Sequence, residues 1–156
     1  MNDSKEGRGP IYSAEREQDF DEALKTVADS GLSISDEARE NLRAYGDLVI
    51  DRSAVYNLIS PVDRGRFFTR HITESLCRPL VEHALREGSL VDIGSGAGLP
   101  GIPLSIMVPQ LRTLLVEPRL RKAQFLEMVV FKLGMSERVE IFQGTGQDAK
   151  IWDPSK

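Results

Sequence analysis

The residues best suited to chemistry are three glycines and two carboxylates that accompany short apolar segments. Gly94, Gly96 and Gly98 follow the apolar run at residues 90–93, which contains Asp92, and Glu117 ends the next apolar run, at residues 113–116. Glycines lack a Cβ, so a ligand can approach their main chain, and an ionised carboxylate accepts hydrogen bonds from hydroxyl groups. A strand, a glycine turn and a later acidic residue together predict a site for a nucleoside cofactor.

Two cofactors compete for this turn. Residues 96–101 match the dinucleotide pattern GxGxxG, but the glycine that leaves the strand directly is Gly94. Pro100 and Pro103 also remove two N–H donors from the entrance of the next helix, where a diphosphate would bind. S-adenosylmethionine (SAM) carries a sulfonium and an ammonium group but no phosphate, so it suits the turn better. A dinucleotide-dependent oxidoreductase fragment stays open as the weaker alternative.

Each of these residues has an expected role toward SAM. Asp92 would receive the ammonium group of the methionine moiety, directly or through water, while the glycines let the main chain approach the ligand. Glu117 would accept hydrogen bonds from both ribose hydroxyls. The competing interpretation is a tight turn between a strand and a helix, with solvated acidic residues.

Composition favours a single soluble domain of the cytoplasm. The chain has 156 residues, 40% of them hydrophobic, and a formal net charge of −4, which gives no overall attraction to nucleic acid. No segment approaches the ~20 consecutive apolar residues of a membrane span, and the first ten residues do not resemble a signal peptide. His71 and His83 are the two histidines and Cys77 the one cysteine, so we expect no metal site and a buried, unreactive thiol.

The periodicity of apolar residues divides the chain into three parts. Residues 1–13 are expected to form a flexible tail, 14–88 an N-terminal helical cap, and 89–156 an α/β unit that binds SAM. The cap should hold helices over 15–28, 35–51 and 65–86, the last split by Pro79. The α/β unit should alternate strands at 90–93, 113–116 and 139–142 with helices at 102–108 and 119–133. Such alternation predicts right-handed crossovers and a parallel, Rossmann-like sheet.

Several motifs resemble one known family. The run from Asp92 to Leu104 reads DIGSGAGLPGIPL; upstream lie RHITESL at residues 70–76 and Tyr56-Asn57-Leu58, and downstream Glu117-Pro118 and RKAQFL at 121–126. Together they resemble the bacterial small-subunit ribosomal RNA methyltransferase G family, also called glucose-inhibited division protein B. The glycine turn alone marks only a class I methyltransferase, and the Pro-Gly-Ile-Pro extension is more specific. The resemblance covers about residues 35–147.

The resemblance implies a class I, SAM-dependent methyltransferase that acts on N7 of a guanine in 16S ribosomal RNA, within the small ribosomal subunit or free. It assigns Gly94 and Leu99 to cofactor contacts, Glu117 to the ribose, and Gly146 with Gln147 to the loop beside the adenine. Gln147 departs from the acidic residue usual in the family. Guanine N7 already has an in-plane lone pair, so no general base is assigned and catalysis would come mainly from alignment of the reactants.

Basic residues near the site are candidates for contacts with RNA phosphates. They are Arg70, with Arg64 and Arg66 close by in sequence, and Arg119, Arg121 and Lys122 at the start of the long helix. A solvated helix face explains each position equally well. His71 is expected to be structural.

Three strands are fewer than a class I methyltransferase sheet contains, so we expect an incomplete sheet in a chain that lacks a C-terminal part. The first strand then becomes an edge with unpaired main-chain groups, which invites pairing with another chain. Activity of this chain would be reduced or absent. The alternative function is a non-catalytic, oligomeric α/β protein that binds SAM or another nucleoside.

Overall fold

The structure is a computed structural model that describes residues 9–148, 153 and 155, with side chains from residue 14 onward. Its first helix, α1 (Gly9–Asp29), begins six residues earlier than the expected start at residue 15. The prediction of a tail is therefore wrong for residues 9–13, while residues 1–8 lie outside the described part. Pro10 lies in the first helical turn, where a missing N–H costs no hydrogen bond, so it does not prevent the earlier start.

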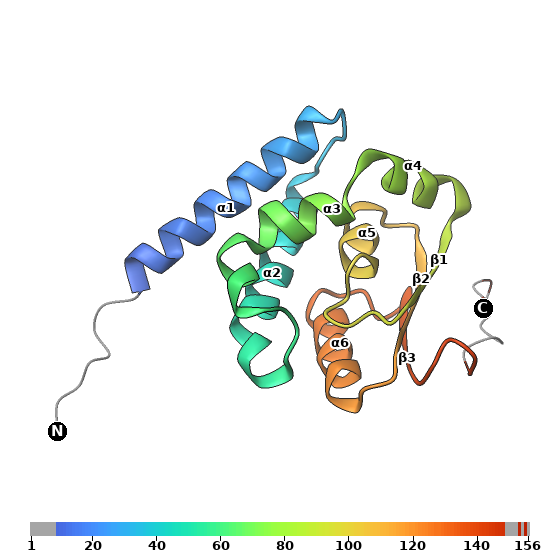
Figure 1. Ribbon diagram of the computed structural model, residues 1–156. Helices are drawn as coiled ribbons and strands as arrows, with labels where there is room; N and C mark the ends of the chain where they lie inside the picture. Colours follow the sequence, from blue (N-terminus) through green and yellow to red (C-terminus); the bar gives the residue numbers. More distant parts are fainter. Residues whose placement is uncertain (1–8, 149–152, 154, 156) are drawn as a thin grey trace, which may run out of the picture.

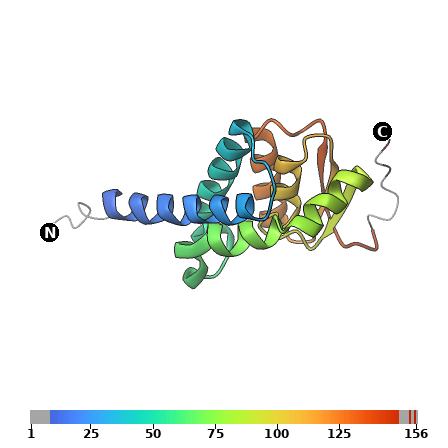
Figure 2. The same cartoon turned by 90° about the horizontal axis from the view of Figure 1, so that it is seen from above.

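Helix α2 (Asp36–Tyr56) packs beside α1 and has caps at both ends. The Ser35 hydroxyl accepts a hydrogen bond from the Ala38 N–H, and Asn57 ends the helix in the left-handed conformation at φ 53°. In Figure 2, α1 projects away from the rest of the molecule, so only part of its length packs on the body.

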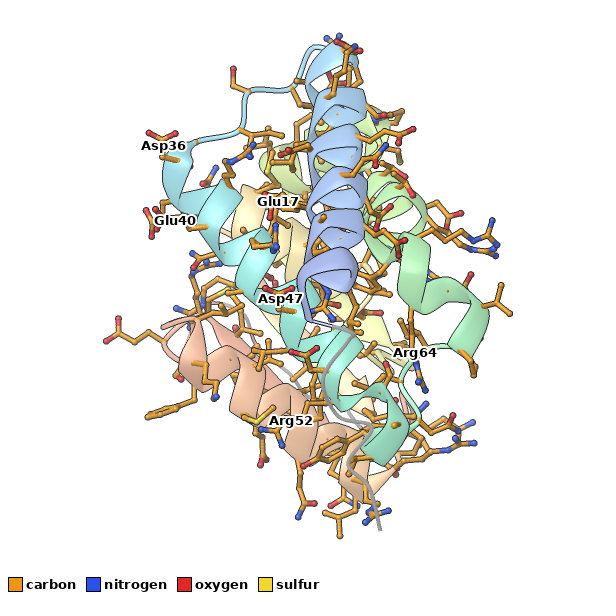
Figure 3. All side chains as sticks on the ribbon, turned by 90° about the vertical axis from the view of Figure 1, so that its left-hand side faces the viewer. Glu17, Asp36, Glu40, Asp47, Arg52 and Arg64 are labelled. Carbon is orange, nitrogen blue, oxygen red and sulfur yellow. The ribbon has the colours of Figure 1, made fainter. Side chains whose placement is uncertain are left out.

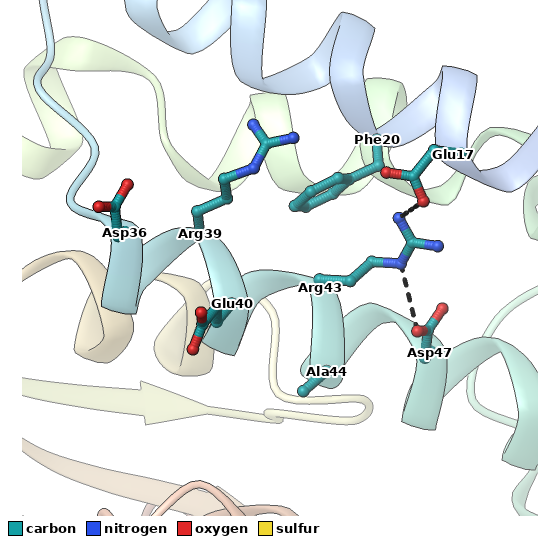
Figure 4. Close-up of a pocket in the computed structure, with 8 residues that line it drawn as sticks. All are labelled: Glu17, Phe20, Asp36, Arg39, Glu40, Arg43, Ala44 and Asp47. Carbon is teal, nitrogen blue, oxygen red and sulfur yellow. Dashed lines mark hydrogen bonds and ion pairs between the residues drawn. The ribbon is translucent and has the colours of Figure 1, made fainter.

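Charged side chains join the exposed sides of α1 and α2. Arg43 bridges Glu17 of α1 and Asp47 of α2, and the Phe20 ring lies 5.1 Å from the guanidinium carbons of Arg39 and Arg43 (Figure 4). These side chains line an open groove, and the contacts of Arg39 and Arg43 with α1 hold the two helices together across it. We therefore assign the groove to helix packing.

The segment between α2 and the sheet is a series of short helices. A 3₁₀ turn, η1 (Pro61–Arg66), leads into a π-helical turn, η2 (Phe68–Ile72), then α3 (Thr73–Ser75) and α4 (Arg78–Glu87). The break before α4 agrees with the expected split at Pro79. The irregular turn at η2 was not expected; the buried Asp19 carboxylate of α1 accepts hydrogen bonds from the Phe68 and Thr69 N–H groups, at 2.8 and 3.1 Å.

The remaining elements form a parallel sheet with two helices. The strands β1 (Ser89–Ile93), β2 (Arg112–Glu117) and β3 (Val139–Gln143) pair in the order β1-β2-β3, and α5 (Gly101–Met107) and α6 (Leu120–Lys132) connect them. All five elements lie within one or two residues of their expected bounds. The predicted α/β, Rossmann-like architecture with a helical N-terminal region is confirmed.

One hydrophobic core joins the N-terminal helices to the sheet. It runs from Phe20 on α1 to Val139 on β3, and α2 packs against both α5 and α6. Helices α5 and α6 lie on the same side of the sheet (Figure 1). The strand β1 lies at one edge of the described sheet, as expected. On this strand, Val91 and Ile93 are 44% and 66% exposed.

Three further findings concern expectations from composition. Within residues 9–148, no helix has the length and hydropathy needed to cross a membrane. The described side chains include no cluster of three metal-ligating groups. Cys77 is exposed at the N-terminus of α4, so the expectation of a buried thiol is wrong; the split before Pro79 leaves it in the connection rather than on a packed helical face.

Candidate cofactor site

The carboxyl ends of β1 and β2 lie side by side and carry the glycine loop, residues 94–100. Ile93 is in register with Val116, and the Val116 carbonyl accepts hydrogen bonds from the Gly94 and Ser95 N–H groups, at 2.8 and 3.0 Å. The Ser95 hydroxyl donates to the Asp92 carbonyl at 2.8 Å. In parallel sheets, ligands bind at this end of the strands. The loop is therefore held tightly at the edge where a nucleoside would bind.

Glu117, the last residue of β2, supports the loop from below. Its side chain is nearly buried, Oε2 accepts the Gly96 N–H at 2.9 Å, and Oε1 accepts the Arg119 N–H at 2.9 Å. A carboxylate has about four acceptor positions, so each oxygen keeps one for another donor. Both oxygens thus remain able to bind the two hydroxyls of a ribose.

The glycines of this loop and Gly101, the first residue of α5, differ in the space around them. A Cβ on Gly94 would meet no atom within 4 Å, and one on Gly96 would meet only the Gly94 carbonyl oxygen at 3.9 Å. A Cβ on Gly98 would lie 2.5 Å from Ile102, and one on Gly101 would lie 2.4 Å from Leu115. Gly98 and Gly101 are thus required by internal packing, whereas Gly94 and Gly96 border open space.

Asp92 is a second buried carboxylate, directly below the loop. It is 8% exposed, and its Oδ2 accepts the Gly101 N–H at 3.1 Å. Burial raises the pKa of Asp92 to about 6, with a smaller opposing effect from the Gly101 hydrogen bond. No arginine, lysine or histidine is among the described groups that shift its pKa. Asp92 is therefore largely ionised at neutral pH without a cationic neighbour, an arrangement that favours a cationic ligand.

We expect Asp92 to make stability fall as pH rises. The pKa is about 6 in the folded protein and near 3.8 in the unfolded chain, so the folded state binds more protons between these values. Relative to Asp92→Asn, the wild-type protein should lose about 2 kcal/mol of unfolding free energy between pH 4 and pH 7. Urea unfolding at several pH values measures this difference.

Asp148→Asn provides the control for this prediction. Hydrogen bonds from Thr145 lower the pKa of Asp148, so its contribution has the opposite sign and is lost as the pH falls. If Asp92→Asn follows the wild-type pH dependence unchanged, Asp92 does not titrate as the structure indicates.

The loop after β3 returns to the end of β1. A Cβ on Gly146 would lie 3.0 Å from the Ile93 side chain, so this glycine packs closely beside the strand end, while Gln147 is exposed. The acidic residue of this loop is Asp148, which accepts hydrogen bonds from the Thr145 N–H and hydroxyl. The sequence analysis considered Gln147 for the acidic position of this loop and missed Asp148, although Asp148 is the next residue.

Leu99 lies at the other end of the glycine loop, next to the N-terminal helices. It is partly buried, its peptide bond to Pro100 is cis, and it lines a small pocket with His71 and Ser75. The structure thus brings the family motif at residues 70–76 against the glycine loop, although the two segments are separate in sequence.

The candidate RNA-binding residues form two groups. Arg70, Arg66 and His71 gather around Asp63, with N–O distances of 3.4, 3.4 and 3.6 Å. The second group is Arg119, Arg121 and Lys122, which line a shallow groove between the end of α2 and the start of α6. The other residues that line this groove are Val55, Tyr56, Asn57 and Leu120. Arg70 therefore has an acidic partner, while the second group adjoins Glu117 in sequence.

The apolar periodicity that predicts a helix over residues 35–51 does not reveal the polar contact that Tyr45 makes from this helix. The Tyr45 ring is fully buried, and its hydroxyl donates a hydrogen bond to the Ala97 carbonyl in the glycine loop at 2.9 Å. A buried tyrosine hydroxyl needs a partner, so a tyrosine within an apolar stripe was itself a signal.

Comparison with known proteins agrees with this arrangement. Residues 38–148 match the family described as rRNA small subunit methyltransferase G. Three relatives carry the name Ribosomal RNA small subunit methyltransferase G. That of Frankia alni is 37% identical over 69% of this chain and 40% of the relative. That of Nocardioides sp. strain JS614 is 38% identical over 81% of this chain and 47% of the relative. That of Mycobacterium marinum is 35% identical over 79% of this chain and 52% of the relative.

The match includes the glycine loop, Glu117 and the motif that contacts Leu99. The chain spans about half the length of these curated relatives. The chain belongs to the rRNA small subunit methyltransferase G family.

Proposed function

We propose that this chain forms the SAM-binding part of an enzyme that methylates N7 of a guanine in 16S ribosomal RNA in the cytoplasm. The observation that carries the proposal is the pair of buried carboxylates, Asp92 and Glu117, that hold a loop whose Gly94 and Gly96 border open space. Family membership supports the ribosomal RNA substrate.

The residues present fit SAM better than a dinucleotide. Asp92 would receive the ammonium group of the methionine moiety, and Glu117 would accept the ribose hydroxyls. A dinucleotide would need to place its diphosphate at the start of α5, where the Asp92 carboxylate already accepts the Gly101 N–H. A second negative group there would be repelled, and Pro103 offers no N–H.

The remaining residues of the site would contact different parts of the cofactor. Gly94 and Leu99 would touch the cofactor from the loop, while Gly96 and Gly98 shape the main chain around it. Gly146 would lie beside the adenine, with Gln147 at the rim, because Gly146 packs against the end of β1.

The protein would contribute to the reaction mainly by aligning the two reactants. SAM supplies an electrophilic methyl group when bound, and the guanine N7 lone pair attacks without losing a proton first. The chain's residues would hold the two reactants in line and exclude water, and we assign no general base among them. Orientation of bound reactants can contribute up to about 7–11 kcal/mol to lowering the barrier.

RNA would approach from the basic side of the site. Arg119, Arg121 and Lys122 start the helix that follows Glu117, and Arg70 lies on the segment that contacts Leu99. These side chains would bind phosphates. The opposite approach over α1 and α2 is unfavourable to RNA, because acidic side chains, among them those labelled in Figure 3, outnumber the arginines and lysines of these two helices.

Calorimetric titration tests the cofactor assignment. SAM should bind and NAD should not, and SAM affinity should decline below pH about 6 as Asp92 becomes protonated. Binding of NAD without binding of SAM would contradict the proposal. Transfer of labelled methyl from SAM to undermethylated small ribosomal subunits, with the label mapped to guanine N7, tests the reaction.

A second candidate is a nucleoside-binding protein without catalysis that associates through β1. Among the described strands β1 has an edge without a partner, and this edge and the exposed Val91 and Ile93 favour the second candidate. SAM binding by a stable oligomer, with no methyl transfer to the ribosomal subunit, would support this candidate over the enzyme.

A further inference from the structure

Among the described hydrogen bonds, the one from Tyr45 joins the N-terminal helices to the glycine loop. The Tyr45 hydroxyl, on α2, hydrogen-bonds the Ala97 carbonyl 52 residues further along the chain. The other described hydrogen bonds of residues 94–101 come from the sheet ends, the loop and α5. Tyr45 therefore connects this loop to a different part of the fold.

This hydrogen bond fixes one peptide group of the loop at both ends. The Ala97 carbonyl accepts from Tyr45, and the N–H of the same peptide, on Gly98, donates to the Ser95 carbonyl at 2.7 Å. The preceding peptide is different: within the described chain, neither the Gly96 carbonyl nor the Ala97 N–H has a hydrogen bond. Fixing the second peptide restricts the first, to which it is joined at the Ala97 Cα and whose polar groups remain available beside Glu117.

The contact of Tyr45 with the glycine loop depends on its hydroxyl and not on its ring. The ring packs edge-on against Phe67, with centroids 6.0 Å apart, and a phenylalanine would fill the same space. Burial, and then the charge of Asp92, raises the pKa of Tyr45 well above its ordinary value, so the phenol stays a neutral donor.

We propose that Tyr45 is a positioning residue for the cofactor, which holds the glycine loop in its ligand-binding conformation through the Ala97 carbonyl. This inference rests on the proposed function of the loop as a SAM site. A loop already in its bound conformation loses less conformational entropy when the ligand binds, so Tyr45 raises affinity without touching the ligand.

The test compares Tyr45→Phe with Ser53→Ala. Ser53 lies on the same helix and its buried hydroxyl donates to the Val49 carbonyl at 2.6 Å, so its removal costs a buried hydrogen bond away from the loop. Calorimetry should give a SAM dissociation constant about tenfold higher for Tyr45→Phe, the change expected for one lost hydrogen bond, and a wild-type value for Ser53→Ala. Wild-type affinity in Tyr45→Phe overturns the proposal.

A second measurement does not depend on SAM. In the ligand-free protein, the amides of residues 94–101 should exchange hydrogen faster in Tyr45→Phe than in wild type or Ser53→Ala. Unchanged exchange overturns the positioning role. If the wild-type chain binds no SAM while exchange still rises in Tyr45→Phe, the proposed function fails and the control of the loop by Tyr45 stands.

The wild-type protein also supplies a test if Tyr45→Phe does not fold. Because loop and ligand are coupled, the Tyr45 hydroxyl proton, observed by NMR, should exchange more slowly with SAM bound. A rate that SAM does not change overturns the proposal.

Discussion

Replacing Glu117 by glutamine should weaken SAM binding by about 100-fold, because the ribose hydroxyls lose a charged acceptor. Hydrogen bonds to ionised groups contribute about 1.5–3 kcal/mol each, more than neutral ones. Glu117→Gln also turns an amide NH₂ toward either the Gly96 or the Arg119 N–H, so a donor faces a donor. Isothermal titration calorimetry with SAM measures the loss.

Two controls separate ribose binding from a general loss of stability. Glu127→Gln removes an exposed carboxylate on α6 and should leave SAM affinity unchanged. A 2′-deoxy analogue of SAM should lose much less affinity on Glu117→Gln than SAM does, because it lacks one of the hydroxyls concerned. Equal losses for both ligands would mean that Glu117 acts through the loop and not on the ribose.

The glycine loop was predictable because its determinants are local. The apolar run before Gly94, the absence of Cβ atoms in the turn and the proline-rich start of α5 are neighbours in sequence. Packing supplied a distinction that the pattern did not contain: Gly98 and Gly101 are glycines because Ile102 and Leu115 leave no room for a Cβ. Only Gly94 and Gly96 border the space where a ligand would lie.

The features that sequence reasoning missed depend on partners far along the chain. The segment at residues 65–76 has helical periodicity, and it becomes a π turn where Asp19, about 50 residues earlier, binds its first N–H groups. The contact of Tyr45 with Ala97 spans 52 residues in the same way. Apolar spacing assigns a residue to the core and does not say which main-chain group its polar atom meets.

Gly96→Ala should reduce SAM affinity by at least about 100-fold while the protein stays folded. The backbone of Gly96 has φ +56°, a left-handed conformation that costs an alanine about 1 kcal/mol or slightly more. The new methyl group would meet no side chain of the protein, so stability falls only by this strain. It would instead occupy the open space beside Glu117, where the nucleoside is expected to lie against the main chain.

Gly134→Ala is the matched control for this substitution. Gly134 follows α6, has φ +67°, and also has no atom within 4 Å of a built Cβ. Thermal unfolding should show similar losses for the two variants, and calorimetry should show loss of SAM binding in Gly96→Ala alone. Because a similar backbone strain is present in both variants, a difference in affinity shows that the change acts at the loop and not through a general loss of stability. Equal SAM affinities would mean that the loop is a tight turn without a ligand beside Gly96, and the cofactor site would have to lie elsewhere.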